Sequence, residues 1–132
     1  MKYVLVLAAS LILGFSSCQV NNTVVGGGTT INGITFSVDT LYMQTGGSGE
    51  LVVGGLARNS SKTTITSPWY IEAQFYTDST FVTKLGGSNT QIGVPLSPGQ
   101  QTFWKIFFST STVDVRQFPN FTVSSLRAYY SN

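Results

Sequence analysis

The sequence predicts an all-β protein, an antiparallel β-sandwich of about seven strands, and two observations support this. From Ile31 onward, short runs rich in Val, Ile, Thr, Tyr and Phe alternate with clusters of Gly, Pro, Asn and Ser, which is the usual pattern of strands and turns. After Cys18 no apolar period of 3.6 residues is present, and strand runs recur about every ten residues, as is typical of sandwiches.

The first predicted strand covers residues 34–39, in which apolar and polar side chains alternate, and residues 41–43 continue it or begin another. After a glycine-rich turn, a second strand covers residues 51–58. The two glycines inside this strand, Gly54 and Gly55, predict a bulge or the close approach of another backbone segment.

Residues 69–76 have the clearest strand pattern in the chain. One face carries the apolar side chains of Trp69, Ile71, Ala73 and Phe75. Burial of large apolar side chains contributes roughly 1.5–3 kcal/mol each, so we expect this strand to be central in its sheet. The opposite face, which we expect to face solvent, carries Tyr70, Glu72, Gln74 and Tyr76.

The later part of the chain predicts strands at residues 80–85, 90–94, 101–109 and 121–130, with a turn at residues 86–89 and a crossover at residues 113–118. The strand at residues 101–109 is unusual because both of its faces are apolar apart from Lys105. Such a strand is either buried on both sides or covers something with its second face.

The N-terminal residues predict where the protein is located in the cell. Lys2 precedes an apolar run at residues 3–15 that is too short to cross a bilayer permanently, and two serines lead into Cys18. This pattern predicts a helical signal peptide at residues 1–17. Residues 15–18 resemble the lipobox of bacterial lipoproteins, which implies that Cys18 is lipidated and becomes the mature N-terminus.

An ordinary cleavage site after Ser16 is the alternative, and it would leave Cys18 as a free thiol. Lipidation would hold the protein at a membrane without a transmembrane helix. Residues 18–30, which include three consecutive glycines, predict a flexible tether, and residues 31–132 predict the sandwich domain.

The composition argues against several classes of function. The chain has no histidine, so a His-based triad or His metal site cannot form, and a single cysteine cannot form an intramolecular disulfide. Seven basic and five acidic residues are spread along the chain without a basic patch, so no nucleic acid partner is expected. The five carboxylates are isolated in predicted turns and strand ends or on an outer face, so we expect no catalytic residues, metal or cofactor.

Three motifs occur in an order that resembles the FxLYD-type extracytoplasmic domains. They are a glycine-containing strand end at residues 53–62, Phe-Tyr-Thr-Asp at residues 75–78, and Leu-Ser-Pro-Gly at residues 96–99 before an aromatic strand. The resemblance covers residues 51–108. It implies an immunoglobulin-like sandwich found in bacterial or archaeal cell-envelope proteins that are mostly not enzymes.

Together these features predict a non-enzymatic lipoprotein that is anchored through a lipid on Cys18, faces the periplasm or cell surface from the outer membrane, and binds other envelope proteins. Binding of carbohydrate through exposed aromatic rings, or a structural role in a surface fibre, are the alternatives. The candidate binding surface comprises Tyr70, Tyr76, Trp104 and Tyr130, with one face of residues 103–108 also available. The sheet edge near residues 80–94 could accept a strand from a partner.

Overall fold

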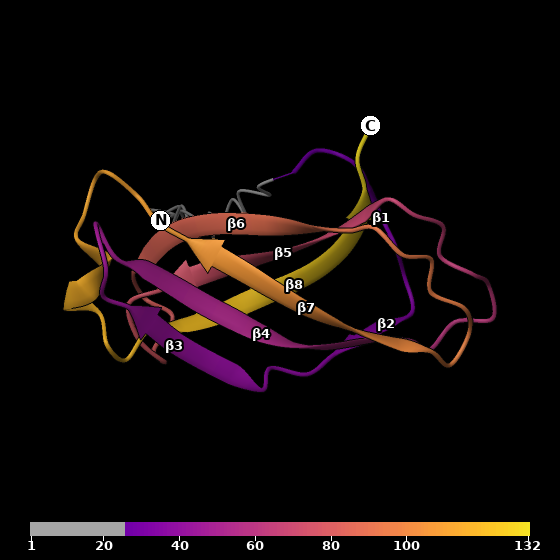
Figure 1. Ribbon diagram of the computed structural model, residues 1–132, viewed down its shortest axis with the longest axis horizontal. Coiled ribbons are helices and arrows are strands. Elements are labelled where there is room, and N and C mark those ends of the chain that lie inside the picture. Colours follow the sequence, from indigo (N-terminus) through magenta and orange to yellow (C-terminus); the bar gives the residue numbers. More distant parts are fainter. Residues whose placement is uncertain (1–25) are drawn as a thin grey trace, which may run out of the picture.

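Figure 1 shows the computed structural model of the protein, which describes residues 26–132. The predicted signal peptide, Cys18 and the first part of the predicted tether lie outside the described residues. The described residues form eight strands, arranged as two antiparallel sheets that enclose one apolar core. The prediction of an all-β sandwich is therefore confirmed.

The first sheet, called sheet A, has the strand order β1-β8-β5-β6. Its strands are β1 (Thr29–Thr30), β8 (Thr122–Tyr130), β5 (Trp69–Tyr76) and β6 (Lys84–Ile92). The central position of β5, with β8 on one side and β6 on the other, is the position that its fully apolar face predicted.

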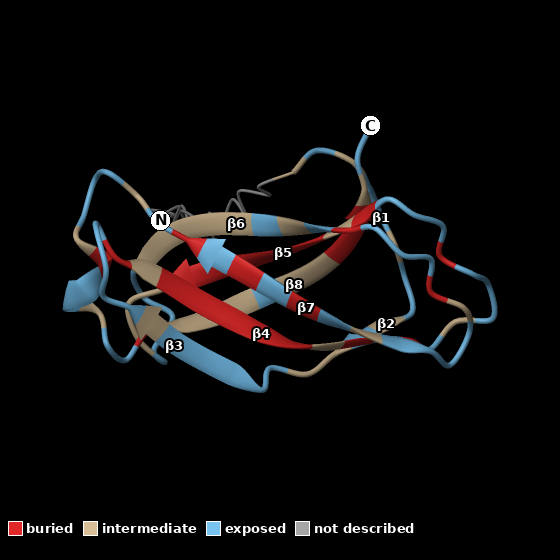
Figure 2. Ribbon diagram, viewed as in Figure 1, coloured by how far each residue is buried: buried red, intermediate tan, exposed pale blue. Residues whose placement is uncertain are grey.

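The second sheet, called sheet B, is organised around β4 (Glu50–Asn59). Two short strands, β2 (Ile34–Phe36) and β3 (Thr40–Gln44), pair one after the other along one edge of β4, and β7 (Gln101–Phe108) pairs along its other edge. In Figure 2 the buried residues run along β4 and β5, whereas most of β3 is exposed.

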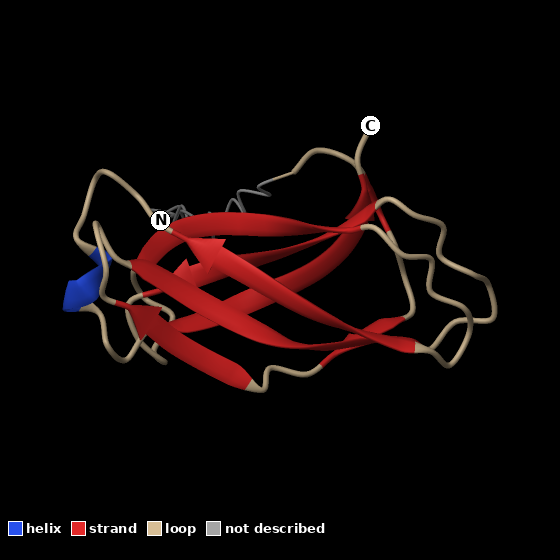
Figure 3. Cartoon of the chain, in the orientation of Figure 1, coloured by secondary structure: helices blue, strands red, loops and turns tan. Residues whose placement is uncertain are grey.

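The connection from β7 to β8 contains the 3₁₀ helix η1 (Val115–Gln117), drawn in blue in Figure 3. Asp114 caps this helix, because its carboxylate accepts a hydrogen bond of 3.0 Å from the backbone N–H of Arg116. The predicted crossover at residues 113–118 is thus an ordered turn of helix, and its Val115 side chain joins the core.

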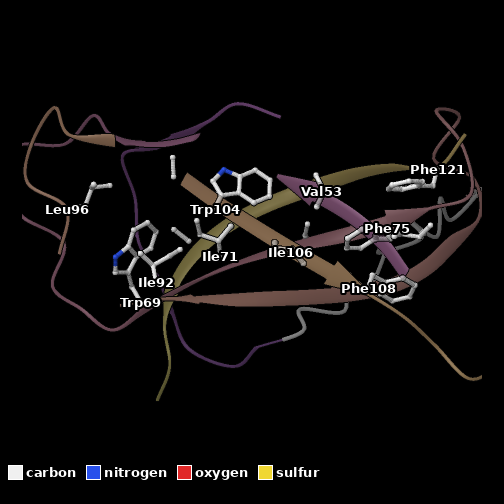
Figure 4. Packing of buried hydrophobic residues seen from close by; sticks show 14 of the residues in the cluster. Val53, Trp69, Ile71, Phe75, Ile92, Leu96, Trp104, Ile106, Phe108 and Phe121 are labelled. Carbon is white, nitrogen blue, oxygen red and sulfur yellow. The ribbon is translucent and has the colours of Figure 1, made fainter. Parts of the chain in front are cut away.

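The core lies between the facing sides of the two sheets (Figure 4). The four apolar residues of β5 are fully buried, as predicted. Phe75 stacks on Phe108 of sheet B with 4.9 Å between ring centroids. The Phe121 ring is nearly parallel to the Phe75 ring, and their centroids are 6.2 Å apart. Stacked aromatic pairs contribute about 0.5–1.5 kcal/mol beyond the burial of their area, so this end of the core helps to fix how the sheets face each other.

Gly54 and Gly55 allow another backbone segment to approach β4 closely, as the sequence predicted. A Cβ atom at Gly55 would lie 1.8 Å from the carbonyl oxygen of Ser37, in the bend between β2 and β3. The same bend is joined to β4 by a hydrogen bond of 2.9 Å from the Ser37 N–H to the Leu56 carbonyl. The glycine pair therefore lets one edge of β4 carry two short strands in succession.

The predicted turn at residues 86–89 is wrong, because β6 runs through this segment without a break. Gly86 pairs with Phe75 of β5, and a Cβ atom at Gly86 would lie 2.8 Å from the ring of Phe108. The glycine makes room for an aromatic ring of the other sheet, and it does not end the strand. The strand predicted at residues 80–85 accordingly begins only at Lys84.

The part of the predicted tether that the structure describes is attached to sheet A. Thr29 and Thr30 form β1, which pairs with the end of β8, and the backbone of Gly26 makes hydrogen bonds to side chains of sheet A. The expectation of a flexible tether is therefore wrong for residues 26–30. A two-residue strand is too short for a sequence pattern to reveal.

We expect the substitution Gly55→Ala to lower the free energy of unfolding by about 3 kcal/mol, since overpacking against a backbone carbonyl cannot be relieved by rotating a side chain. Gly93→Ala is the matched control, because nothing lies within 4 Å of a Cβ atom there. It should change stability by about 1 kcal/mol or less. Urea unfolding followed by circular dichroism measures both values, and equal midpoints would contradict the close approach at Gly55.

Candidate functional site

Strand β7 places its side chains alternately inside and outside the sandwich. Trp104, Ile106 and Phe108 are buried in the core, whereas Phe103, Lys105 and Phe107 are exposed on the outer side of sheet B. The exposed fraction is 81% for Phe103 and 46% for Phe107. Burial of this strand on both sides, one of the two predicted explanations, is therefore wrong, because its second face is exposed among the described residues.

The strand register extends this apolar surface across sheet B. Val52 of β4 pairs with Tyr42 of β3 on one side and with Phe107 of β7 on the other, so the three side chains form one row on the outer face. Val52 is fully buried although it faces outward, and its neighbours Leu51 and Val53 point into the core. We call the outer surface formed by Tyr42, Leu56, Phe103, Lys105 and Phe107 the sheet B face, and Val52 lies beneath it.

A hollow of about 440 Å³ lies in the sheet B face over the two glycines of β4. It is lined by Asp39, Thr40, Gly54, Gly55, Phe103, Trp104 and Lys105. The row Thr40–Gly54–Lys105 crosses the sheet here, and its central residue has no side chain to fill the space. The Lys105 ammonium lies 5.8 Å from the centre of the Tyr42 ring, a cation–π distance, which places a positive charge beside the aromatic row.

The structure does not bring the predicted surface residues together. Trp104 is buried, and its ring meets Phe36 edge to face at 6.3 Å, so the expectation that it is exposed is wrong. Tyr76 is half-buried against Phe81, with ring centroids 5.3 Å apart. The Tyr130 hydroxyl accepts a hydrogen bond of 3.1 Å from the Thr66 N–H.

The outer face of sheet A has a different character, because its central charged residues are paired. Glu72 is only 2% exposed, which contradicts the prediction of a solvated carboxylate. Its Oε1 accepts a hydrogen bond of 2.8 Å from Arg127 Nε, and its Oε2 accepts one of 3.1 Å from the Gly26 N–H. Arg127 also donates to the Gly26 carbonyl at 2.7 Å and to Thr30 Oγ1 at 3.0 Å.

We call this set of contacts the N-terminal clamp, since it joins Gly26 and Thr30 to β5 and β8. Tyr129 extends it: the Arg127 guanidinium lies 4.5 Å from the centre of its ring, and Tyr70 stacks on the ring at 5.4 Å. Burial raises the pKa of the Tyr129 hydroxyl, while a hydrogen bond of 2.7 Å from Asn89 acts in the opposite direction. Tyr70 is thus part of an internal packing arrangement.

A second cavity, of about 590 Å³, opens at the end of the sandwich where the β5–β6 connection meets the segment after η1. Asp78 and Lys84 are among its lining residues. The Asp78 carboxylate accepts hydrogen bonds from the hydroxyl and backbone of Thr80, which lower its pKa. This carboxylate shapes the local turn, and within residues 26–132 no three Cys, Asp or Glu side chains gather in a way that could hold a metal ion.

Removal of the clamp cation should destabilise the fold. We expect Arg127→Met to lower the free energy of unfolding by about 2–3 kcal/mol, because the buried Glu72 carboxylate would lose its charged partner while a fifth of the Arg127 side chain is exposed. Arg116→Met is the matched control: its pair with Asp114 has the same 2.8 Å distance but is exposed to solvent, so this substitution should change stability much less than Arg127→Met.

Hydrogen exchange provides the second readout for this pair of variants. Arg127→Met should speed amide exchange at residues 26–30, and Arg116→Met should not. Equal losses of stability in the two variants, with unchanged exchange at residues 26–30, would contradict the clamp.

A scan against protein-family models finds no match to this chain, and searches of curated proteins and of solved structures find none either. The resemblance to the FxLYD-type domains therefore stays a prediction. Within residues 26–132 no helix has the length and apolar character needed to cross a membrane.

Proposed function

We propose that this protein is a non-enzymatic binding module of the cell envelope, anchored through a lipid on Cys18, and that the sheet B face is the surface by which it binds another envelope protein. One observation carries the proposal. Phe103, Phe107 and Tyr42 are exposed on the same face of the sandwich, and Phe103 lines a hollow in this face that a partner side chain could fill.

The composition of the sheet B face is that of a protein interface. Contiguous exposed apolar patches on a monomer mark interaction sites, and the centres of interfaces are enriched in aromatic residues and poor in charge. Lys105 is the one charged side chain within the face as defined, and it lies over the Tyr42 ring. The sequence supports a location in the cell envelope, because the predicted signal peptide precedes all of the described residues.

The two sheets would divide the tasks of attachment and binding. The N-terminal clamp fixes Gly26 on the outer face of sheet A. Seven residues, 19–25, separate it from the proposed lipid site at Cys18, and the eight Cα-to-Cα steps between the two span at most roughly 30 Å. The anchor would therefore keep the sandwich close to the membrane, attached from the side of sheet A, and leave sheet B available.

The double substitution Phe103→Ser/Phe107→Ser should weaken partner binding by a factor of about 30 or more, since buried aromatic anchors at an interface centre contribute at least about 1–2 kcal/mol each. Affinity capture from detergent-solubilised envelopes, followed by titration with the captured protein, measures the effect. Both side chains are largely outside the core, so the fold should be retained.

Phe81→Ser is the matched control for that experiment. Phe81 is 48% exposed, close to the 46% of Phe107, but it packs against Tyr76 of sheet A and lies outside the sheet B face. It should leave capture unchanged. If Phe81→Ser abolished capture while the Phe103/Phe107 variant bound normally, the binding surface would have been assigned to the wrong sheet.

Lipidation is tested independently of partner binding. Mass spectrometry of the N-terminal peptide should show a mature chain that begins at Cys18 and carries acyl groups. The substitution Cys18→Ser should release the protein from membranes. A mature chain that begins at Ser17 and has an unmodified thiol would refute lipid anchoring at Cys18. It would not bear on the proposal that the sheet B face binds a partner.

Carbohydrate binding is the second candidate, favoured by the hollow itself. Phe103 at its rim could stack on a sugar ring, and Asp39, Thr40 and Lys105 supply hydrogen-bonding groups. A glycan bound there should give a saturable heat of binding when purified envelope polysaccharide is titrated into the protein in a calorimeter. Saturable binding of polysaccharide without any captured protein would favour the glycan over the protein partner.

A further inference from the structure

The sandwich protects most of its sheet edges. At one corner, β6 of sheet A lies beside β7 of sheet B, and the Ser88 hydroxyl donates a hydrogen bond of 2.6 Å to the Phe107 carbonyl. This contact closes the sheet edge predicted to accept a partner strand, near residues 80–94, at Ser88. The outer strand β1 contains two residues and β2 contains three, so neither offers much backbone to an added strand.

Strand β3 is the exception among the described edges. It is five residues long, contains no charge and no proline, and exposes 44% of Leu41 and 39% of Tyr42. Within the described residues β3 pairs with β4 alone, which leaves its other edge open (Figure 2). Natural sheets usually protect such an edge with lysine, proline or a bulge, because unpaired backbone groups are a template for strand addition.

The residues of β3 are arranged symmetrically about Tyr42. In order they are Thr40, Leu41, Tyr42, Met43 and Gln44: polar, apolar, aromatic, apolar and polar. Antiparallel pairing of this strand with itself would place polar opposite polar, apolar opposite apolar and Tyr42 opposite Tyr42. A two-fold interface requires a surface that is complementary to itself, and this pattern meets the requirement without placing like charges opposite each other.

From these observations we propose that a second copy of this chain pairs with the open edge of β3, forming a two-fold dimer in which the two B sheets become one continuous sheet. Leu41 would be covered by Met43 of the partner subunit. Because Tyr42, Val52 and Phe107 lie in one row, the row continues across the axis into Tyr42 of the partner subunit. The dimer thus doubles the sheet B face, whichever ligand that face binds.

Two double variants that differ only at position 40 test the dimer. Both carry Gln44→Lys, at an exposed position that pairs with Glu50 within the chain. Thr40→Lys/Gln44→Lys places lysine opposite lysine twice across the axis, whereas Thr40→Glu/Gln44→Lys places glutamate opposite lysine twice. Like charges in cross-strand pairs are unfavourable and opposite charges are favourable, so the dissociation constant should be at least about tenfold higher for the first variant than for the second.

Sedimentation equilibrium of the full-length chain in density-matched detergent measures the dissociation constants. The native chain and the Thr40→Glu/Gln44→Lys variant should be dimers, and the Thr40→Lys/Gln44→Lys variant should be shifted toward monomer. A native chain that stays monomeric, or equal dissociation constants for the two variants, would overturn the proposal. The Phe103→Ser/Phe107→Ser variant should remain dimeric, so failure of the dimer is distinguishable from failure of the binding surface.

Discussion

Two adjacent glycines in β4, Gly54 and Gly55, determine the shape of sheet B. Because Gly55 has no side chain, the carbonyl of Ser37 can approach β4, and the first part of the domain bends from β2 to β3 along a single edge. Because Gly54 has none either, the outer face of the same strand is hollow beside exposed aromatic rings. One feature of the backbone thus shapes both the edge strand and the proposed binding surface.

The two outer faces of the sandwich differ in whether their side chains have partners within the chain. On sheet A, Glu72 and Arg127 neutralise each other and bind the backbone of Gly26, so this face is occupied by the chain's own N-terminal segment. On sheet B, Phe103 and Phe107 project outward and remain exposed. Exposure of such large apolar rings costs solvation free energy, which a partner would recover on binding. This asymmetry is the physical basis for assigning attachment to one sheet and recognition to the other.

Sequence patterns predicted the features of this fold that are local. Alternation along residues 69–76 indicated the buried face of β5, and paired glycines indicated the close approach at β4. Features that depend on distant partners were missed: Glu72 is buried because Arg127 lies opposite it on β8, and Gly86 is inside a strand because the Phe108 ring of sheet B needs its space. In β7 both faces are apolar, so a two-residue period could not decide that Trp104 points inward and Phe103 outward.

The proposed division of tasks requires that sheet B, and not sheet A, meets the partner in the envelope. A photo-crosslinking amino acid placed at Phe103, on sheet B, can be compared in intact cells with one at Gln91, an exposed position of β6 on the outer side of sheet A. We expect a discrete crosslinked protein from position 103 and none from position 91. Crosslinking from position 91 alone would contradict the assignment of binding to sheet B.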